Sequence, residues 1–353
     1  MNEIIVETEY GQVPRQSTIA ILIPCHNEEK MIAKSISACL NQTRRPDLIL
    51  VVDDGSTDNS CAILESFGDK IKLVKLEKNT GNKSYVQQIG LTHIDCDIFI
   101  STDADSLPDR RFVEYIEKEF LDPNVCAAAG YVMSIKHNWL TALREIEYFV
   151  GQEVHKTAQA NINYLYVIPG CASAFRTELF KNNITFDHDT ITEDLDFTFK
   201  LHLKNFRISF QKKAIVWTQD PADLKSYINQ LRRWYGGGWQ NLLKHRQTAA
   251  VMPACAFELS MIFIEGILFA LTLLILPFVN LKVFALMAAV HLLTTTILGI
   301  LAAIRRRRLD LALYSPLYIV LAVINSYIFC EQFLKEVIMR ERNLYWFTPK
   351  RRE

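Results

Sequence analysis

The first 220 residues alternate short apolar runs with longer amphipathic stretches. Apolar runs at residues 18–24, 48–52, 71–76 and 98–101 predict four buried strands. The amphipathic stretches that follow these runs predict helices ending near residues 40, 67, 93 and 120. Strands that alternate with helices of this length indicate an α/β fold, in which helices cover both faces of a parallel sheet.

The pattern continues with elements of less regular length. Residues 126–133, 207–210 and 214–217 predict further strands, and residues 139–159 and 193–205 predict helices, the first of them long and amphipathic. Another helix begins at Pro221. It is predicted to end at Gln230 to Trp234, because three glycines follow at positions 236–238.

Three long apolar segments occupy the C-terminal part of the chain, at residues 257–278, 283–304 and 311–329. Each is close to the ~20 residues that a helix needs to cross a bilayer, so the sequence predicts a transmembrane region. The basic run Arg305 to Arg308 separates the last two segments, and basic loops are typically cytosolic. A third crossing would place Lys335, Arg340 and Arg342 outside, against this tendency. Either one segment is re-entrant or interfacial, or the tendency fails here.

Composition and charge narrow the class of protein. Of 353 residues, 39 are basic and 39 acidic, and this balance argues against a nucleic acid as partner. The eight cysteines include no Cys-x-x-Cys pair, which predicts free thiols in a reducing compartment. Residues 1–16 are polar, so no secretory signal is expected and the soluble part is predicted to be cytosolic.

These patterns divide the chain into five predicted parts. They are an N-terminal tail (1–17), a soluble α/β domain (18–235), an interfacial connector (236–255), transmembrane helices (256–334) and a basic C-terminal tail (335–353).

Acidic residues directly follow two of the predicted strands. Asp53 and Asp54 follow the second strand, and Asp103 and Asp105 follow the fourth. Ligands bind at the carboxyl ends of the strands in such sheets, so both pairs are expected at one crevice. Asp103 and Asp105 are plausible oxygen ligands for Mg²⁺ or Mn²⁺ holding a diphosphate. Asp53 or Asp54 can accept hydrogen bonds from a uracil N–H or ribose hydroxyls, and a turn or helix-cap role is an equally simple interpretation of them. The alternative for Asp103 and Asp105 is an ordinary turn, where the Asp-x-Asp pattern is common.

A second acidic motif opens the helix predicted at residue 193. Thr190 to Glu193 fits a capping box, which would make Glu193 structural. Asp194 is then free to take the proton from an acceptor hydroxyl as a general base. Lys83 begins another predicted helix, where it either meets phosphate or is a solvated surface lysine.

Gln230, Arg233 and Trp234 form an unusual polar and aromatic cluster. Arginine presents a planar fork of donors to phosphate oxygens, tryptophan presents an apolar face to a sugar ring, and glutamine both donates and accepts hydrogen bonds. The alternative is an ordinary helix end whose arginines face solvent.

Five motifs together resemble glycosyltransferase family 2 in that family's order, at residues 24–28, 53–56, 103–105, 192–194 and 230–234. The resemblance covers residues 18–245, and its last motif is similar to that of the processive synthases of cellulose, chitin, hyaluronan and poly-N-acetylglucosamine. It implies a GT-A fold, a Rossmann-like mixed sheet with helices on both faces, followed here by a C-terminal α-helical transmembrane region. It also implies an inverting mechanism, a UDP-sugar donor and a divalent metal.

The resemblance also implies roles for individual residues. The base would be Asp194, and the metal ligands would be Asp103 and Asp105. The donor would be bound by Glu28, Asp53, Asp54, Lys83, Asp103, Asp105 and Arg233. The acceptor would be bound by Gly170, Cys171, Glu193, Gln230 and Trp234.

The sequence therefore predicts a membrane-anchored inverting β-glycosyltransferase. It would move a hexose or N-acetylhexosamine from a UDP-sugar to a growing glycan, as a processive polysaccharide synthase. One alternative is a single addition to a polyisoprenyl phosphate or another lipid, and another is an inactive membrane scaffold or sugar-binding subunit. The expected partners are the donor, a glycan or lipid acceptor and membrane lipids. A homo-oligomer or a partner membrane subunit is also possible, because three spans are few to enclose a polymer channel.

Overall fold

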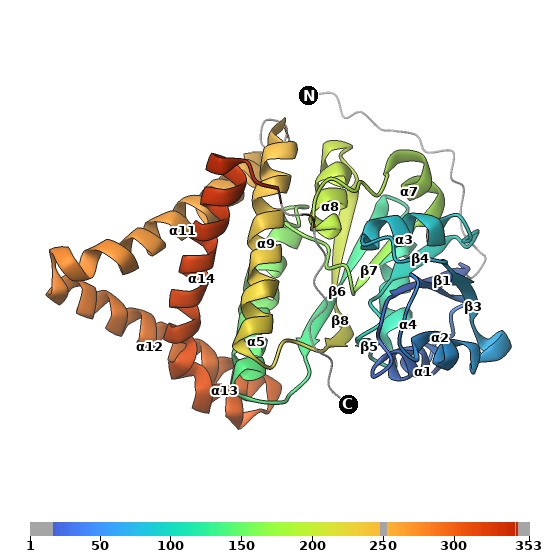
Figure 1. The fold of residues 1–353 in the computed structure, drawn as a ribbon, viewed down its shortest axis with the longest axis horizontal. Helices are drawn as coiled ribbons and strands as arrows, with labels where there is room; N and C mark the ends of the chain where they lie inside the picture. Colours follow the sequence, from blue (N-terminus) through green and yellow to red (C-terminus); the bar gives the residue numbers. More distant parts are fainter. Residues whose placement is uncertain (1–16, 248–252, 343, 345–353) are drawn as a thin grey trace.

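The computed structural model describes residues 17–247, 253–342 and 344 (Figure 1). Nearly all of the predicted N-terminal tail and much of the predicted basic tail fall outside these residues. Inside them lie a sheet flanked by helices and a group of long C-terminal helices.

The described residues form an eight-stranded sheet with the order β3-β2-β1-β4-β7-β6-β8-β5. The strands are β1 (Ile19–Cys25), β2 (Leu48–Asp53), β3 (Lys72–Lys75), β4 (Ile98–Ser101), β5 (Ser106–Pro108), β6 (Val125–Ser134), β7 (Ser173–Arg176) and β8 (Arg207–Thr218). The first four strands pair in parallel, as the alternating pattern predicts.

The second half of the sheet makes it mixed. Strand β7 runs antiparallel to both β4 and β6, and β5 runs antiparallel to β8. The prediction of an all-parallel sheet was therefore wrong for this half, whereas the mixed sheet of the GT-A fold is confirmed. The two short strands predicted at 207–217 are one strand, β8, paired to β6 across an irregular register.

Both faces of the sheet are covered by helices, because the strands bury their side chains on both sides. The helices are α1 (Ile32–Leu40), α2 (Ser60–Glu65), α3 (Lys83–Leu91), α4 (Phe112–Glu117), α7 (Thr177–Asn183) and α8 (Glu193–Leu203), with short 3₁₀ turns η1 (Gly68–Lys70) and η2 (Lys118–Leu121). Ile21 and Ile23 of β1 pack with α1, α2 and α4, and Leu22 packs with α3, α7 and α8 on the other face. These two clusters form the core of the domain.

A long helical segment follows β6 and extends the domain toward the C-terminal helices. It consists of α5 (Trp139–Phe149), the π-helical stretch η3 (Val150–Lys156) and α6 (Thr157–Asn161). The long helix predicted at residues 139–159 is thus confirmed. Gln152 exchanges two hydrogen bonds with the backbone of Val132 on β6, which fixes the π-helical stretch against the sheet.

Helix α9 (Leu224–Lys244) differs most from its prediction. It begins after Pro221, with Asp223 as its cap, and it continues without a break through Gly236 to Gly238. The prediction of a helix end before the glycines was wrong. A side chain at Gly237 would lie 2.3 Å from Thr192 Oγ1, so the glycines let α9 approach α8 closely instead of ending the helix.

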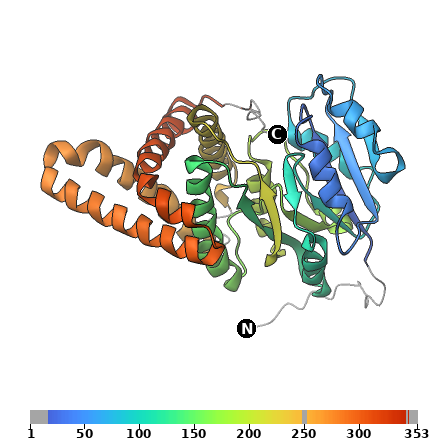
Figure 2. The same cartoon turned by 90° about the horizontal axis from the view of Figure 1, so that it is seen from below.

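The C-terminal helices are α11 (Pro253–Val279), α12 (Leu281–Arg306), α13 (Leu309–Tyr314), the turn η4 (Ser315–Leu317), α14 (Tyr318–Phe333) and the π-helical stretch η5 (Leu334–Met339). Figures 1 and 2 both show α11 and α12 projecting away from the sheet and meeting at their far ends. Helix α14 lies beside α9 (Figure 1). By length and composition, Leu281–Arg306 and Leu309–Met339 could each cross a membrane. The first predicted span is helical, but side chains of its first half lie outside the described residues.

Candidate active site

One large cavity lies between the sheet and helices α5 and α9, with a volume of about 960 Å³. Twelve of the thirteen residues predicted for the site line it. They are Glu28, Asp54, Lys83, Asp103, Asp105, Gly170, Cys171, Glu193, Asp194, Gln230, Arg233 and Trp234. Asp53 is the exception, because it is buried and its carboxylate accepts a hydrogen bond from Ser56 Oγ in the turn that follows β2.

The loops after β1, β2 and β3 form one end of the cavity. The Asp54 carboxylate accepts hydrogen bonds from Thr80 N (2.9 Å) and Thr80 Oγ1 (3.0 Å). His26 Nδ1 lies 2.8 Å from the Asp54 carbonyl oxygen, and Asn79 Nδ2 lies 2.9 Å from His26 Nε2. These contacts hold three loops in a fixed arrangement around the cavity, so this end can hold a rigid, flat ligand group.

Lys83 occupies the middle of the site. Its Nζ lies 2.6 Å from Asp103 Oδ1 and 2.9 Å from Glu193 Oε1, and its side chain is only 11% exposed. Burial by itself would lower the Lys83 pKa, but the carboxylates of Asp103 and Glu193 raise it, so the ammonium stays charged. The lysine therefore joins the end of β4 to the start of α8, and the surface lysine alternative was wrong.

Glu193 is consequently not the member of a capping box. Helix α8 has Thr192 as its cap residue, and no side-chain cap hydrogen bond forms there. The capping alternative for Glu193 was wrong, because the ion pair with Lys83 draws its carboxylate into the cavity.

Asp194 lies next to this ion pair and has an altered acidity. Its Oδ2 accepts a hydrogen bond from the Gly170 backbone N–H at 3.4 Å, and its Oδ1 accepts one from Leu195 N at 2.9 Å. Burial and the neighbouring Glu193 carboxylate raise the Asp194 pKa to about 6, against the opposing influence of Lys83 and Arg233. A carboxylate with this pKa is mostly ionised at neutral pH and holds a captured proton better than an exposed aspartate.

Asp103 and Asp105 provide the oxygen donors at the end of β4. Asp103 is partly exposed, and Asp105 is buried to 7% exposure with its Oδ1 accepting from Ser106 Oγ at 3.1 Å. Two carboxylates that line one cavity offer the oxygen donors that a hard divalent cation takes, so these residues fit Mg²⁺ or Mn²⁺. A cation bound here would take the place of Lys83 at Asp103.

Gln230, Arg233 and Trp234 line the wall that α9 forms. Oε1 of Gln230 is buried and has no hydrogen-bond partner among the described residues. The guanidinium of Arg144 on α5 lies 4.6 Å from the centre of the Trp234 ring and so holds the indole in place. Gln230 is thus available to a ligand in the cavity, beside an indole of fixed orientation.

The sequence did not identify the residues that α5, η3 and α6 contribute. Glu147, Tyr148, Gln152, His155, Lys156 and Gln159 all line the cavity. Successive members are one, three or four residues apart, which keeps them on one helix face, and this spacing was visible in the sequence. Burial lowers the Lys156 pKa to about 8 despite the nearby Cys171 and Asp194.

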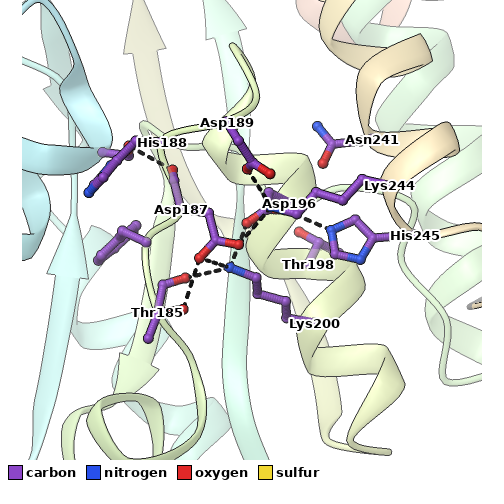
Figure 3. A network of polar contacts seen from close by, with 12 residues as sticks. Thr185, Asp187, His188, Asp189, Asp196, Thr198, Lys200, Asn241, Lys244 and His245 are labelled. Atoms are coloured by element: carbon purple, nitrogen blue, oxygen red, sulfur yellow. Dashed lines mark hydrogen bonds and ion pairs between the residues drawn. The ribbon is translucent and has the colours of Figure 1, made fainter.

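A second group of carboxylates lies outside the cavity, at the start of α8 (Figure 3). Oxygens of Asp187, Asp189 and Asp196 lie within 4.8 Å of one another, a separation that a metal ion could bridge. Lys244 lies 2.6 to 2.7 Å from all three, and Lys200 lies 2.7 to 2.8 Å from Asp187 and Asp196. Because each of the three carboxylates is already paired with at least one ammonium group, the group ties α9 to α8 and is a poor cation site.

The mixed sheet with a cavity at its strand ends is the arrangement of the GT-A fold. Residues 20–183, a little under half of the chain, match the family model "Glycosyl transferase family 2", so this part of the chain is similar to the glycosyltransferases of that family.

Curated relatives include two poly-β-1,6-N-acetyl-D-glucosamine synthases. The one from Staphylococcus epidermidis is 27% identical over 245 residues, which is 68% of this chain and 58% of that protein. The one from Staphylococcus aureus (strain COL) is 28% identical over 254 residues, or 71% of this chain and 61% of that protein. The chain thus matches about three fifths of the length of these relatives.

Two solved structures share the fold. The mannosyltransferase PcManGT from Pyrobaculum calidifontis, in complex with GDP-Man and Mn²⁺, has a TM-score of 0.64 at 20% identity, covering 93% of this chain and 89% of that one. Residues 1–349 of TarS from S. aureus, in complex with UDP, have a TM-score of 0.51 at 18% identity, covering 90% of this chain and 91% of that one. These two similarities concern the fold.

Proposed function

We propose that this glycosyltransferase is a membrane-bound, inverting enzyme that transfers a hexose or N-acetylhexosamine from a UDP-sugar to a growing glycan. The observation that carries the proposal is that one cavity is lined by Asp103 and Asp105, by Asp194, and by the wall containing Arg233 and Trp234. Each of the three groups supplies one requirement of glycosyl transfer: a diphosphate site, a base and a sugar platform.

In the proposed donor site, the uracil and ribose lie at the end formed by Asp54, His26 and Asn79. The diphosphate lies near Asp103 and Asp105, where a bound Mg²⁺ or Mn²⁺ would neutralise the charge that develops on the departing UDP. Arg233 donates to the diphosphate oxygens, since a guanidinium matches their geometry. Lys83 keeps Asp103 and Glu193 in position through its two ion pairs.

In the proposed acceptor site, the terminal sugar lies on Trp234 with its hydroxyl directed at Asp194. Asp194 takes the hydroxyl proton as the oxygen attacks the anomeric carbon from the side opposite UDP, and this single displacement inverts the configuration. The backbone N–H of Gly170 keeps the Asp194 carboxylate oriented. Oε1 of Gln230 accepts a hydrogen bond from another sugar hydroxyl.

Processive synthesis is supported by the curated relatives, whose names describe them as polymer synthases. The test is incubation of membranes containing the enzyme with labelled UDP-glucose or UDP-N-acetylglucosamine and Mg²⁺ or Mn²⁺. We expect a high-molecular-weight product, and no product from Asp105→Asn membranes of equal protein content. Transfer that needs neither UDP-sugar nor divalent metal would contradict the proposal.

A second function, one addition to a polyisoprenyl phosphate or another lipid, is favoured by one feature of the cavity. Phe329 of α14 lines it, so its wall includes a residue of an apolar C-terminal helix. Product length distinguishes the two functions, because a single-sugar lipid is extracted into organic solvent and a polysaccharide is not.

A further inference from the structure

The C-terminal helices attach to the catalytic domain in different ways. We propose that α11 and α12 cross the bilayer as a hairpin, and that α14 lies along the membrane surface on the side of the catalytic domain. The chain that follows α14 then stays on that side as well. This inference rests on the membrane anchoring in the proposed function, but not on the substrate or the reaction.

Helix α14 and η5 are bonded to the catalytic domain along their length. The Tyr318 hydroxyl donates to Glu147 Oε1 (3.0 Å), Tyr227 OH donates to Asn325 Oδ1 (2.6 Å), Arg232 Nε donates to Glu331 Oε2 (2.9 Å), and Gln240 Nε2 donates to Glu336 Oε1 (2.9 Å). At 1.5 Å per residue, the distance from Tyr318 to Glu336 is about 27 Å. A helix must be about 30 Å long to cross the bilayer core. Nearly that whole length of α14 and η5 is therefore bonded to the catalytic domain.

The partners of α14 cannot lie inside the hydrocarbon core. They belong to α5 and α9, which carry Glu147, Arg232 and Arg233 and line the cavity that also contains the acidic residues of the site. A charged side chain in the hydrocarbon core costs several kcal/mol, and α9 carries more than one. Since α9 stays in water, α14 cannot cross the membrane beside it.

The other face of α14 and η5 is apolar and uncovered. Val320, Val323, Tyr327, Leu334 and Ile338 are 46%, 51%, 62%, 52% and 61% exposed. Their spacing of three, four, seven and four residues places them on one helix face. Glu331 interrupts this face, and its charge is paired with Arg232 and Lys335. A helix with one apolar face outward and one face bonded to a polar domain is suited to the membrane interface.

Helix α12 has the opposite character, since it projects from the domain (Figures 1 and 2). It exposes apolar residues such as Leu286, Val290 and Leu293. Its 26 residues span about 39 Å, enough to cross a bilayer even when tilted. Its last turn returns to the domain, where Arg306 Nε donates to Glu145 Oε1 at 2.9 Å.

The turn between α11 and α12 carries the polar residues Asn280 and Lys282. Lys282 is exposed, and a lysine is stable only at a membrane surface, so the turn lies at the headgroups of the far side. The basic residues Arg305, Lys335 and Arg340 then all lie on the near side. This arrangement satisfies the positive-inside tendency that three crossings would violate.

The test is labelling with a membrane-impermeant maleimide in intact and in permeabilised cells. Cysteines are added one at a time to the full chain, as Lys70→Cys on the catalytic domain, Asn280→Cys in the turn and Glu341→Cys after η5. All three positions are uncovered in the structure, and the parent chain gives the background from native cysteines. Asn280→Ser is the matched control without a new thiol.

We expect Asn280→Cys to gain label in intact cells, whereas Lys70→Cys and Glu341→Cys gain it only after permeabilisation. Label on Glu341→Cys but not on Lys70→Cys in intact cells would show that α14 crosses, and would overturn the inference. Recovery of the chain in the soluble fraction, or an Asn280→Cys thiol protected together with Lys70→Cys, would overturn the hairpin. If Lys70→Cys and Glu341→Cys are labelled together in intact cells and Asn280→Cys is protected, the hairpin holds and only the proposed cytosolic orientation fails.

Discussion

At the scale of single residues, the chemistry of the site depends on how neighbouring charges are arranged. Lys83 lies between Asp103 and Glu193, so three charged groups share a small volume beside Asp194. The sequence identified all four residues, but not the ion pairs among them. Those pairs depend on α3, α8 and the end of β4 meeting at one point, which no local pattern encodes.

Asp194→Asn should remove the base without removing the ligand site. An amide cannot take the acceptor proton, so we expect kcat to fall by about 10²–10⁴-fold with little change in the KM for the donor. Radiolabelled transfer assays on detergent-solubilised enzyme provide the measurement, with the melting temperature as a control for folding. Activity within a few-fold of the parent would assign the base to another residue.

The pH dependence of kcat should report the same carboxyl group. Burial and Glu193 raise the Asp194 pKa to about 6, and the base works only when it is ionised. Activity should therefore be constant above this pH and fall about tenfold per pH unit below it. The residual activity of Asp194→Asn should lack this fall, and a profile shared by both proteins would exclude Asp194 as its source.

At the scale of elements, the close packing of α9 against α8 places the two halves of the site. Asn241 Nδ2 donates to Thr192 O (3.1 Å) and Thr192 Oγ1 (2.9 Å), and Gly237 lies against the same threonine. Sequence patterns favoured a helix end at the glycines, because glycine is common at the C-terminal ends of helices. The contact with Thr192, 45 residues earlier in the chain, explains why the helix continues instead.

Gly237→Ala should separate these helices. The added methyl group would lie 2.3 Å from Thr192 Oγ1, so we expect a loss of about 1–3 kcal/mol in stability and a lower kcat. Thermal unfolding and transfer assays measure the two effects. Gly151→Ala is the stability control, since a methyl group there meets nothing within 4 Å, and equal melting temperatures for both variants would contradict the packing argument.

Asp196→Asn should loosen the same pair of helices one turn further along α8. Asp196 is 1% exposed and pairs with Lys200 (2.8 Å), Lys244 (2.7 Å) and His245 (2.7 Å), as Figure 3 shows. Removing the charge should cost on the order of 3 kcal/mol, because the lysines lose their buried counter-ion. Asp189→Asn, at a side chain that is 53% exposed, should cost at most about 1 kcal/mol, and denaturant unfolding compares the two.

At the scale of the whole molecule, a polar catalytic domain is joined to an apolar hairpin. Apolar residues of α11 and α12 such as Leu274, Phe278 and Leu293 are more than half exposed in the structure, and a bilayer would cover them. The domain boundary predicted at residue 235 falls inside α9, which continues without a break to Lys244. Gln240 and Asn241 are buried against α8 and η5, which differs from the interfacial connector predicted for residues 236–255.

The hairpin predicts how the protein behaves on extraction. High salt and alkaline carbonate remove proteins that are bound to the membrane by charge. They do not remove a protein whose apolar surface is buried in the bilayer, which stabilises it by roughly 25 cal/mol per Å². We expect the chain to stay in the membrane pellet under these conditions and to be released only by detergent. Fractionation followed by immunoblotting checks this, and release by salt alone would mean that α11 and α12 are not inserted.

The sequence by itself determined the local chemistry and much of the secondary structure. Alternation of apolar runs predicted β1 to β4 and the helices between them, because each element carries its own hydrophobic periodicity. The acidic residues at the ends of β2 and β4 were found for the same reason. They directly follow recognisable strands.

Only the tertiary structure decided how these pieces meet. The mixed pairing around β7, the ion pairs of Lys83 and the course of α9 through its glycines all depend on contacts between residues far apart in the chain. The same is true of α14, whose composition suits a membrane span. Four polar side chains along α14 and η5 bond to α5 and α9, and these distant partners hold the helix against the catalytic domain.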